Sequence, residues 1–422
     1  MTMTAPQDRF VSMDAVRGFA VLGILLMNIV GMGLPAFAYI DPTFYGGSTG
    51  PDFWTWAVNF VLTDGKMRGL FTILFGASMV LIADRAEGGP VGPNQTHYRR
   101  MGWLFVFGMI HAYFLWWGDI LVCYALAGCA AFLFRKLGAR TLIVVGALML
   151  VGLFVKGMAD TAHLAALRDA AAAPGASEAT VKAWTDASFL LRPPAEMANQ
   201  QIAGFGGGFI DALKARSQIA LLMQTILLFP DSIIEAVGQM LIGMGLFRAG
   251  FFTLQWRTRS YLLLMALGYL VAAPLTTWMM RTITASGFDP MVLHEQGVWS
   301  SLPRPFIAVA HASALLLLVR SGALGWLVER MAAAGRMALS NYLGTSIVTT
   351  LLFCGFGFGL YGELHRWQLY LVVLGVWAVI LAWSKPWMER FHYGPFEWAW
   401  RSLVRWELQP FAKSRPTLAP AE

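Results

Sequence analysis

Apolar runs long enough to cross a membrane alternate with short polar or turn-rich segments along most of this chain. A hydrocarbon core about 30 Å thick needs roughly 20 consecutive apolar residues in a helix. The runs of this kind predict about ten transmembrane helices and therefore an all-α, polytopic helical bundle. We assign the helices to residues 14–34, 67–84, 101–117, 119–134, 140–157, 218–247, 260–281, 303–320, 337–359 and 367–384.

The segments around these runs divide the chain into four parts. Residues 1–158 hold the first five predicted helices, and residues 217–384 hold the last five. Between them, residues 159–216 are rich in alanine and polar residues, which predicts an extramembrane helical insert. The tail, 385–422, mixes tryptophans with arginines, a pattern typical of an amphipathic cytoplasmic segment on a membrane surface.

The composition supports a membrane protein and excludes several other classes. Hydrophobic residues make up 57% of the chain and charged residues 13%, and this charged fraction is well below that of a soluble domain. The net charge of +7 is not gathered in basic blocks, which argues against a nucleic-acid partner. Placing both termini in the cytoplasm puts the short positively charged loops inside, as the positive-inside rule requires. The three cysteines lie in apolar runs without metal-ligand spacing, so neither a disulfide framework nor a metal site is predicted.

The first apolar run carries a stripe of polar residues. Asp14, Arg17 and Asn28 return to one face of a helix. A charge at mid-helix costs roughly 2.5–3.5 kcal/mol in lipid, so this face must meet protein or water. We expect it to form one wall of an intramembrane site. The run is long for a signal peptide, which favours a retained first helix.

A histidine and a carboxylate lie close together in the third and fourth predicted helices. His111 precedes Asp119 by eight residues, across a short turn. A histidine near a carboxylate can act as an oriented base, whereas a lone histidine in an apolar helix is otherwise a hydrogen-bonded structural residue. Both interpretations remain open from the sequence.

Later helices carry further polar residues with two possible roles. One face of the sixth predicted helix, which Pro230 is expected to interrupt, holds Gln224, Asp231, Glu235 and Gln239. These residues either bond neighbouring helices or line a cavity opposite the first-helix stripe and His111.

The ninth predicted helix opens with Arg336, Ser340 and Asn341. Arg336 is either a positive-inside anchor or a ligand for phosphate or carboxylate groups. Asp64, Lys66 and Arg68, before the second helix, form either a surface ion-pair network or the rim of an outer opening.

Several motifs together resemble the YeiB-like family of bacterial integral membrane proteins, which contain the domain of unknown function 418. The resemblance covers nearly the whole chain and implies a multi-pass protein of the bacterial inner membrane. The matching motifs are MDAVRGFAVLGILLMN at 13–28, LFTILFG at 70–76, GMIH at 108–111, WGDIL at 117–121, GRMALSNY at 335–342 and YGPFEWAWR at 393–401.

The first-helix motif is also similar to that of membrane acyltransferases, which include sugar O-acetylases and the lysosomal heparan N-acetyltransferase. This resemblance implies an acyl-coenzyme A donor on the cytoplasmic side and a glycan or lipid acceptor on the far side. It places Arg17 near the donor and Asn28 beside the transfer point. The heparan enzyme has its catalytic histidine shortly after that asparagine, and residues 29–39 contain none. His111 is the replacement that we expect.

Three functions follow from these patterns. The first is an acyltransferase without a covalently bound cofactor. In it His111 is the general base, Asp119 or Glu235 orients it, and Asn28 and Tyr113 polarise the thioester carbonyl. The residues predicted to bind the donor or substrate are Asp14, Arg17, Asn28, Tyr113, Arg336, Ser340 and Asn341.

The second function is a transporter or lipid carrier, in which Asp14, Glu235 and His111 couple to protons or contact the substrate. The third is a non-catalytic membrane scaffold. The lipid bilayer is the partner that all three share, and a homo-oligomer is compatible with each.

Overall fold

The computed structural model describes residues 10–227 and 231–413. Helix accounts for 78% of the structure, and no strand is formed in the described part, where Phe391 and Ala412 make an isolated bridge. The helices are α1 (Val11–Gly33), α2 (Gly50–Leu62), α3 (Lys66–Ala86), α4 (Pro93–Ile110), α5 (Leu121–Ala131), α6 (Ala139–Ala172), α7 (Glu178–Leu191), α8 (Glu196–Gly206), α9 (Phe209–Leu222), α10 (Asp231–Arg248), α11 (Thr258–Ala266), α12 (Ala273–Ala285), α13 (Pro290–Trp299), α14 (Arg304–Ser321), α15 (Gly325–Arg336), α16 (Ala338–Phe353), α17 (Arg366–Arg390) and α18 (Pro395–Arg405).

Six helical segments in the described residues are long and apolar enough to cross a membrane. They are Val11–Gly33, Gly50–Ala86, Ala139–Ala172, Thr258–Ala285, Arg304–Ser321 and Arg366–Arg390. Two shorter apolar helices accompany them, Leu121–Phe134 and Ala338–Phe353. The predicted all-α membrane bundle is therefore confirmed. The total of about ten spans and the cytoplasmic placement of both termini stay predictions.

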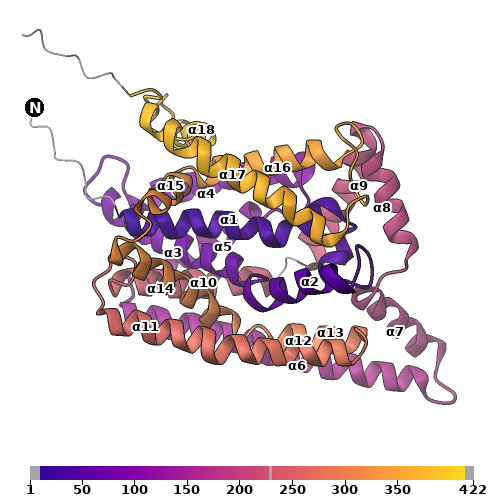
Figure 1. Ribbon diagram of the computed structural model, residues 1–422. Coiled ribbons are helices and arrows are strands. Elements are labelled where there is room, and N and C mark those ends of the chain that lie inside the picture. Colours follow the sequence, from indigo (N-terminus) through magenta and orange to yellow (C-terminus); the bar gives the residue numbers. More distant parts are fainter. Residues whose placement is uncertain (1–9, 228–230, 414–422) are drawn as a thin grey trace, which may run out of the picture.

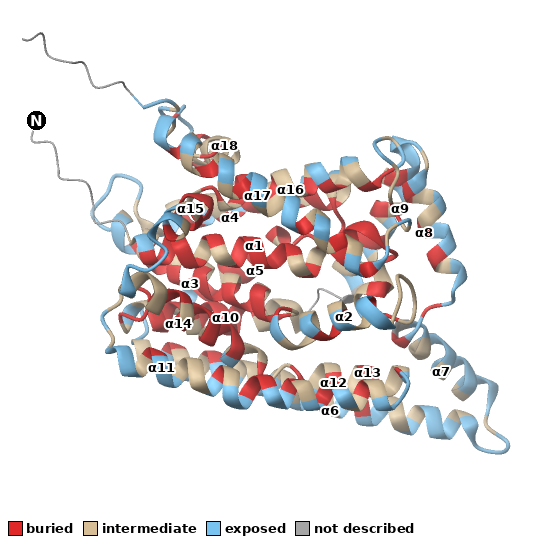
Figure 2. Cartoon of the chain, viewed as in Figure 1, coloured by how far each residue is buried: buried red, intermediate tan, exposed pale blue. Residues whose placement is uncertain are grey.

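Helix α1 runs through the middle of the bundle, where it packs against α3, α15, α16 and α17 (Figure 1). Its most apolar stretch is 78% buried, whereas that of α6 is only 11% buried although its hydropathy of 2.3 is the highest of the six segments (Figure 2). A helix that is apolar all round is either a core helix or faces lipid. The polar stripe belongs to the core helix, as the cost of charge in lipid requires.

Two glycines bring α1 and α15 into backbone contact. A Cβ atom on Gly18 would lie 1.9 Å from the carbonyl oxygen of Met331, and one on Gly335 would lie 1.9 Å from that of Asp14. Small residues at such crossings are the usual way for membrane helices to approach closely. The crossing places the start of α1 beside Arg336, the last residue of α15.

Several predicted helices are divided in the structure. The run 101–117 leaves α-helical geometry at His111–Leu115, which is a π-helical turn, and Leu267–Ala272 forms another between α11 and α12. The run 337–359 begins as α16, while Arg336 belongs to a separate preceding helix. A π turn inserts an extra residue into the ladder and is frequent at functional sites. Pro230, the predicted interruption of the sixth helix, lies outside the described residues.

Candidate functional site

A cavity of about 450 Å³ is lined by residues of the first turns of α1 and by residues of α18. Helices α1, α3, α4, α5, α16 and α18 contribute to its wall. The arginines that line it are Arg17, Arg85, Arg100, Arg336 and Arg401, and two histidines, His97 and His392, also line it. Only two carboxylates, Asp14 and Glu397, are among its described lining residues, so arginines outnumber acids. Such a wall attracts anions, because guanidinium groups bind phosphate and carboxylate oxygens well.

Asp14 and Arg17 form an ion pair at the wall of this cavity. Arg17 Nη1 donates to Asp14 Oδ1 at 2.8 Å, and Arg17 Nη2 donates to Ser78 Oγ at 3.0 Å. The i,i+3 spacing on α1 allows the pair, and α3 supplies the serine. The structure therefore brings Asp14, Arg17 and Arg336 to one cavity. Asn28, three turns further along α1, does not line it.

The remainder of the cavity is apolar. Its wall there is formed by aliphatic and aromatic side chains of α3, α4 and α5, and by two tyrosines, Tyr124 and Tyr342. An arginine-rich region joined to an apolar region suits an amphiphile, a molecule with an anionic group and an apolar body.

Two side chains, Asp119 and Ser346, hydrogen-bond to His111. Its Nδ1 lies 2.8 Å from Oδ1 of Asp119, and its Nε2 lies 2.8 Å from Oγ of Ser346. Asp119 Oδ2 in turn accepts the backbone N–H of Val122 at 2.8 Å. His111 and Ser346 are fully buried, and Asp119 is 6% exposed.

Tyr342 joins this cluster to the cavity. The ring centroids of His111 and Tyr342 are 4.9 Å apart. Ser346 follows Tyr342 by one turn of α16, so both lie on the same face of that helix. Sequence reasoning predicted the pairing of His111 with Asp119 but missed Ser346, because a small hydroxyl in an apolar helix carries no distinguishing pattern.

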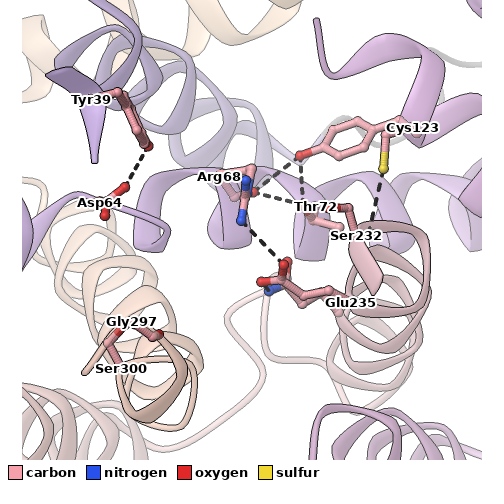
Figure 3. Close-up of polar contacts among 11 residues, drawn as sticks. Tyr39, Asp64, Arg68, Thr72, Cys123, Ser232, Glu235, Gly297 and Ser300 are labelled. Atoms are coloured by element: carbon pink, nitrogen blue, oxygen red, sulfur yellow. Dashed lines mark hydrogen bonds and ion pairs between the residues drawn. The ribbon is translucent and has the colours of Figure 1, made fainter. Parts of the chain in front are cut away.

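The polar residues predicted to form a stripe on the sixth helix bond to several different neighbours. Glu235 pairs with Arg68 at 3.3 Å (Figure 3). It also accepts a hydrogen bond from Gln239 at 3.0 Å. Gln224 accepts from the hydroxyl of Tyr113 at 3.1 Å. Of the two carboxylates predicted to orient His111, Asp119 is the one in contact with it.

Arg68 belongs to a second polar cluster near the start of α3. Figure 3 shows it between Glu235 and the side chains around Thr72, with the Tyr39–Asp64 hydrogen bond of 2.6 Å nearby. The hydroxyl of Tyr124 lies 2.6 Å from that of Thr72 and donates to the carbonyl of Arg68 at 3.3 Å. Tyr124 also lines the large cavity, so it contacts both polar regions.

The side chains of Ser340 and Asn341 make hydrogen bonds that join α16 to neighbouring helices. Glu397 of α18 accepts the backbone N–H groups of Leu339 and Ser340 at 2.7 and 3.1 Å, and the Ser340 hydroxyl also bonds this carboxylate. Asn341 donates to the carbonyl of Ala334 at 3.1 Å and to Ser384 Oγ at 3.2 Å. Glu397 thus satisfies free amides at the N-terminus of α16 from another helix.

Comparison with known proteins places the chain in a family. The family described as "Protein of unknown function (DUF418)" matches residues 246–407. The uncharacterized protein YeiB of Escherichia coli K12 is 31% identical over 94% of this chain and 96% of its own length. The chain belongs to the YeiB-like DUF418 family.

Two other relatives of this DUF418 protein extend over most of both sequences. The uncharacterized protein YxaH of Bacillus subtilis 168 is 28% identical over 97% of this chain and 98% of its own. A 39.9 kDa protein encoded beside an amylase in Bacillus acidopullulyticus is 23% identical over 96% of each chain. No solved structure matches significantly. The DUF418 match includes Arg336, Tyr342, Ser346 and Glu397, while the YeiB similarity extends to the α1 and α4 side of the site.

Proposed function

We propose that this DUF418 protein is an acyltransferase of the bacterial inner membrane. It takes an acyl group from a cytoplasmic acyl-coenzyme A and delivers it to a glycan, lipid or small acceptor at the outer face. The observation that carries the proposal is the buried His111–Asp119 pair one tyrosine ring away from an arginine-lined cavity.

The chemistry of the cavity suits the donor. Its arginines complement the phosphates of coenzyme A, and its apolar region complements the acyl chain with its linker. A volume of about 450 Å³ lies within the range of small-molecule sites. Arg17, fixed by Asp14 and Ser78, presents a preorganised fork to a phosphate.

His111 supplies the proton transfers. Its imidazole accepts the proton of the hydroxyl or amine that attacks the acyl group, as the attacking oxygen or nitrogen bonds to the acyl carbon. The carbon–sulfur bond breaks, and the thiolate leaves with the proton that the imidazolium returns. Asp119 sets the tautomer of His111 and stabilises the imidazolium, since its other oxygen is fixed by the Val122 amide.

Label transfer tests this function. Purified protein in lipid nanodiscs is incubated with radiolabelled acetyl- or palmitoyl-coenzyme A and membrane lipid or glycan acceptors. We expect label in the acceptor fraction, and a loss of roughly 100-fold or more in His111→Asn. Absence of transfer with every donor, together with unchanged coenzyme A binding in Arg17→Ala, would contradict the proposal.

A second candidate function is transport of an amphiphilic anion. It is favoured by the π-helical turns His111–Leu115, Met223–Leu227 and Leu267–Ala272, because interrupted helices often form the substrate sites of transporters. Proton-dependent uptake into liposomes that survives His111→Ala but fails in Glu235→Gln would support transport over acyl transfer.

A further inference from the structure

A hydroxyl, an imidazole and a carboxylate form one continuous chain inside the bundle. Ser346 from α16 contacts His111, and His111 contacts Asp119, at 2.8 Å in each case. Two different atoms of the imidazole make these bonds, so it joins the hydroxyl to the acid. This is the connectivity in which an acid orients a base and the base activates a nucleophile.

A further hydrogen bond fixes the orientation of the Asp119 carboxylate. Its second oxygen accepts the Val122 amide in the first turn of α5, where the helix dipole also favours a negative charge. His111 sits at the start of the π turn that ends α4. Both groups therefore have defined positions before any substrate arrives, as preorganised catalysis requires.

A buried donor beside His111 has no acceptor among the described residues. Trp116 is only 7% exposed, and its indole Nε1–H makes no hydrogen bond there. Its ring centroid lies 6.3 Å from that of His111. An unpaired buried donor is costly and is uncommon without a purpose. A negative oxygen that forms during a reaction at this site would satisfy it.

Residues on either side of Ser346 along α16 line two different cavities. One turn before it on α16, Tyr342 lines the arginine-rich cavity. About one turn after it, Thr349 and Thr350 line a small cavity of about 20 Å³, which Trp116 also borders. Residues at these spacings share a helix face, so Ser346 lies on the face of α16 whose flanking residues line the two cavities.

We propose that Ser346 is the nucleophile that carries the acyl group covalently from the donor to the acceptor. The inference rests on the acyltransferase function proposed above. In the first half-reaction, the Ser346 hydroxyl proton passes to His111 Nε2, and Oγ bonds to the thioester carbonyl carbon. The carbon–sulfur bond then breaks, and the thiolate leaves with the proton from His111.

The second half-reaction reverses these roles. The acceptor hydroxyl or amine gives its proton to His111 and bonds to the acyl carbon, and Ser346 Oγ leaves with that proton. The Trp116 indole donates to the carbonyl oxygen while it is negatively charged in both tetrahedral intermediates. Donor and acceptor then react one after the other, so the large phosphorylated donor never has to meet the acceptor.

Trapping the intermediate tests the inference. The full-length protein in nanodiscs is incubated with radiolabelled acetyl- or palmitoyl-coenzyme A without acceptor, denatured, and analysed for protein-bound label and for an acylated Ser346 peptide. We expect an adduct in the wild type, none in Ser346→Ala, and a hydroxylamine-sensitive thioester in Ser346→Cys. Ser313→Ala removes a buried hydroxyl on α14 that bonds its own helix, and it should label like the wild type.

A fluorophosphonate probe gives a readout that needs no donor. Activated serines react with it, so labelling should occur in the wild type and fall strongly in Asp119→Asn. Trp116→Phe should slow acylation by roughly 100-fold while leaving coenzyme A binding unchanged.

Acyl transfer that continues in Ser346→Ala, with no adduct on the wild type, would overturn the covalent step and leave the proposed function standing. Absence of both adduct and transfer in a monodisperse wild type would overturn both.

Discussion

Tyr342 lines the arginine-lined cavity, and its ring centroid is 4.9 Å from that of His111, which does not line it. Tyr342 is itself only 8% exposed. This ring therefore controls how far a ligand in the cavity can approach the His111–Asp119 pair, and replacing it should change the accessibility of the histidine.

We expect Tyr342→Ala to expose His111 to small reagents from the cavity, because truncation removes the ring that covers it. The rate of His111 modification by diethyl pyrocarbonate, followed by peptide mass spectrometry, should rise several-fold. Tyr342→Phe keeps the ring and should react at the wild-type rate. Equal rates in the alanine variant and the wild type would show that Tyr342 is not the barrier.

Arg17→Ala should weaken the binding of coenzyme A. The variant loses a guanidinium group that Asp14 and Ser78 hold in place, and a hydrogen bond to a charged group contributes about 1.5–3 kcal/mol. Calorimetric titration should show a Kd roughly 10- to 100-fold higher. Arg17→Lys should bind with intermediate affinity because an ammonium group lacks the planar fork.

Arg168 provides the matched control for this substitution. It pairs with Asp169 on α6, where its side chain is 46% exposed, and its replacement by alanine should leave coenzyme A binding unchanged. An equal loss in both variants would point to general electrostatics rather than to a site at Arg17.

Gly335→Ala should lower the free energy of unfolding by about 1–3 kcal/mol, because a methyl group there would overlap the carbonyl of Asp14 and force α1 and α15 apart. It should also weaken coenzyme A binding, since the crossing places Asp14 beside Arg336. Thermal unfolding in detergent and the same titration measure the two effects. Gly344→Ala, where a Cβ meets nothing within 4 Å, should be neutral in both.

Glu397 should make the docking of α18 depend on pH. Burial raises the pKa of its carboxyl above the ordinary value of 4.5. A raised pKa means that the docked state holds the proton more tightly. The stabilisation by Glu397 is therefore complete below the ordinary pKa and is lost as the pH rises through the raised one. The unfolding temperature should follow that trend.

Glu397→Gln should remove this pH dependence and keep the helix docked, since the amide oxygen still accepts the Leu339 and Ser340 amides. Glu397→Ala leaves those amides without their acceptor and should cost about 1–3 kcal/mol. Scanning fluorimetry from about pH 5 to 8 compares the three proteins. A pH profile of Glu397→Gln that matches the wild type would assign the effect to another group.

Relationships within a helix, or across a short turn, could be predicted from the sequence. Asp14 and Arg17 are one turn apart on an apolar run, so geometry and the cost of charge in lipid required a shared, non-lipid face. His111 and Asp119 flank a turn too short to separate them. The apolar runs themselves determined the helical membrane bundle.

Contacts between distant helices were decided only by the tertiary structure. Ser346 reaches His111 across 235 residues, and Glu397 reaches Ser340 across 57. Glu235, which the sequence offered as a partner for His111, pairs instead with Arg68. Periodicity fixes which face of a helix is polar but not which helix meets that face. That choice depends on close packing at places such as Gly18 and Gly335, where only the absence of a side chain lets two backbones touch.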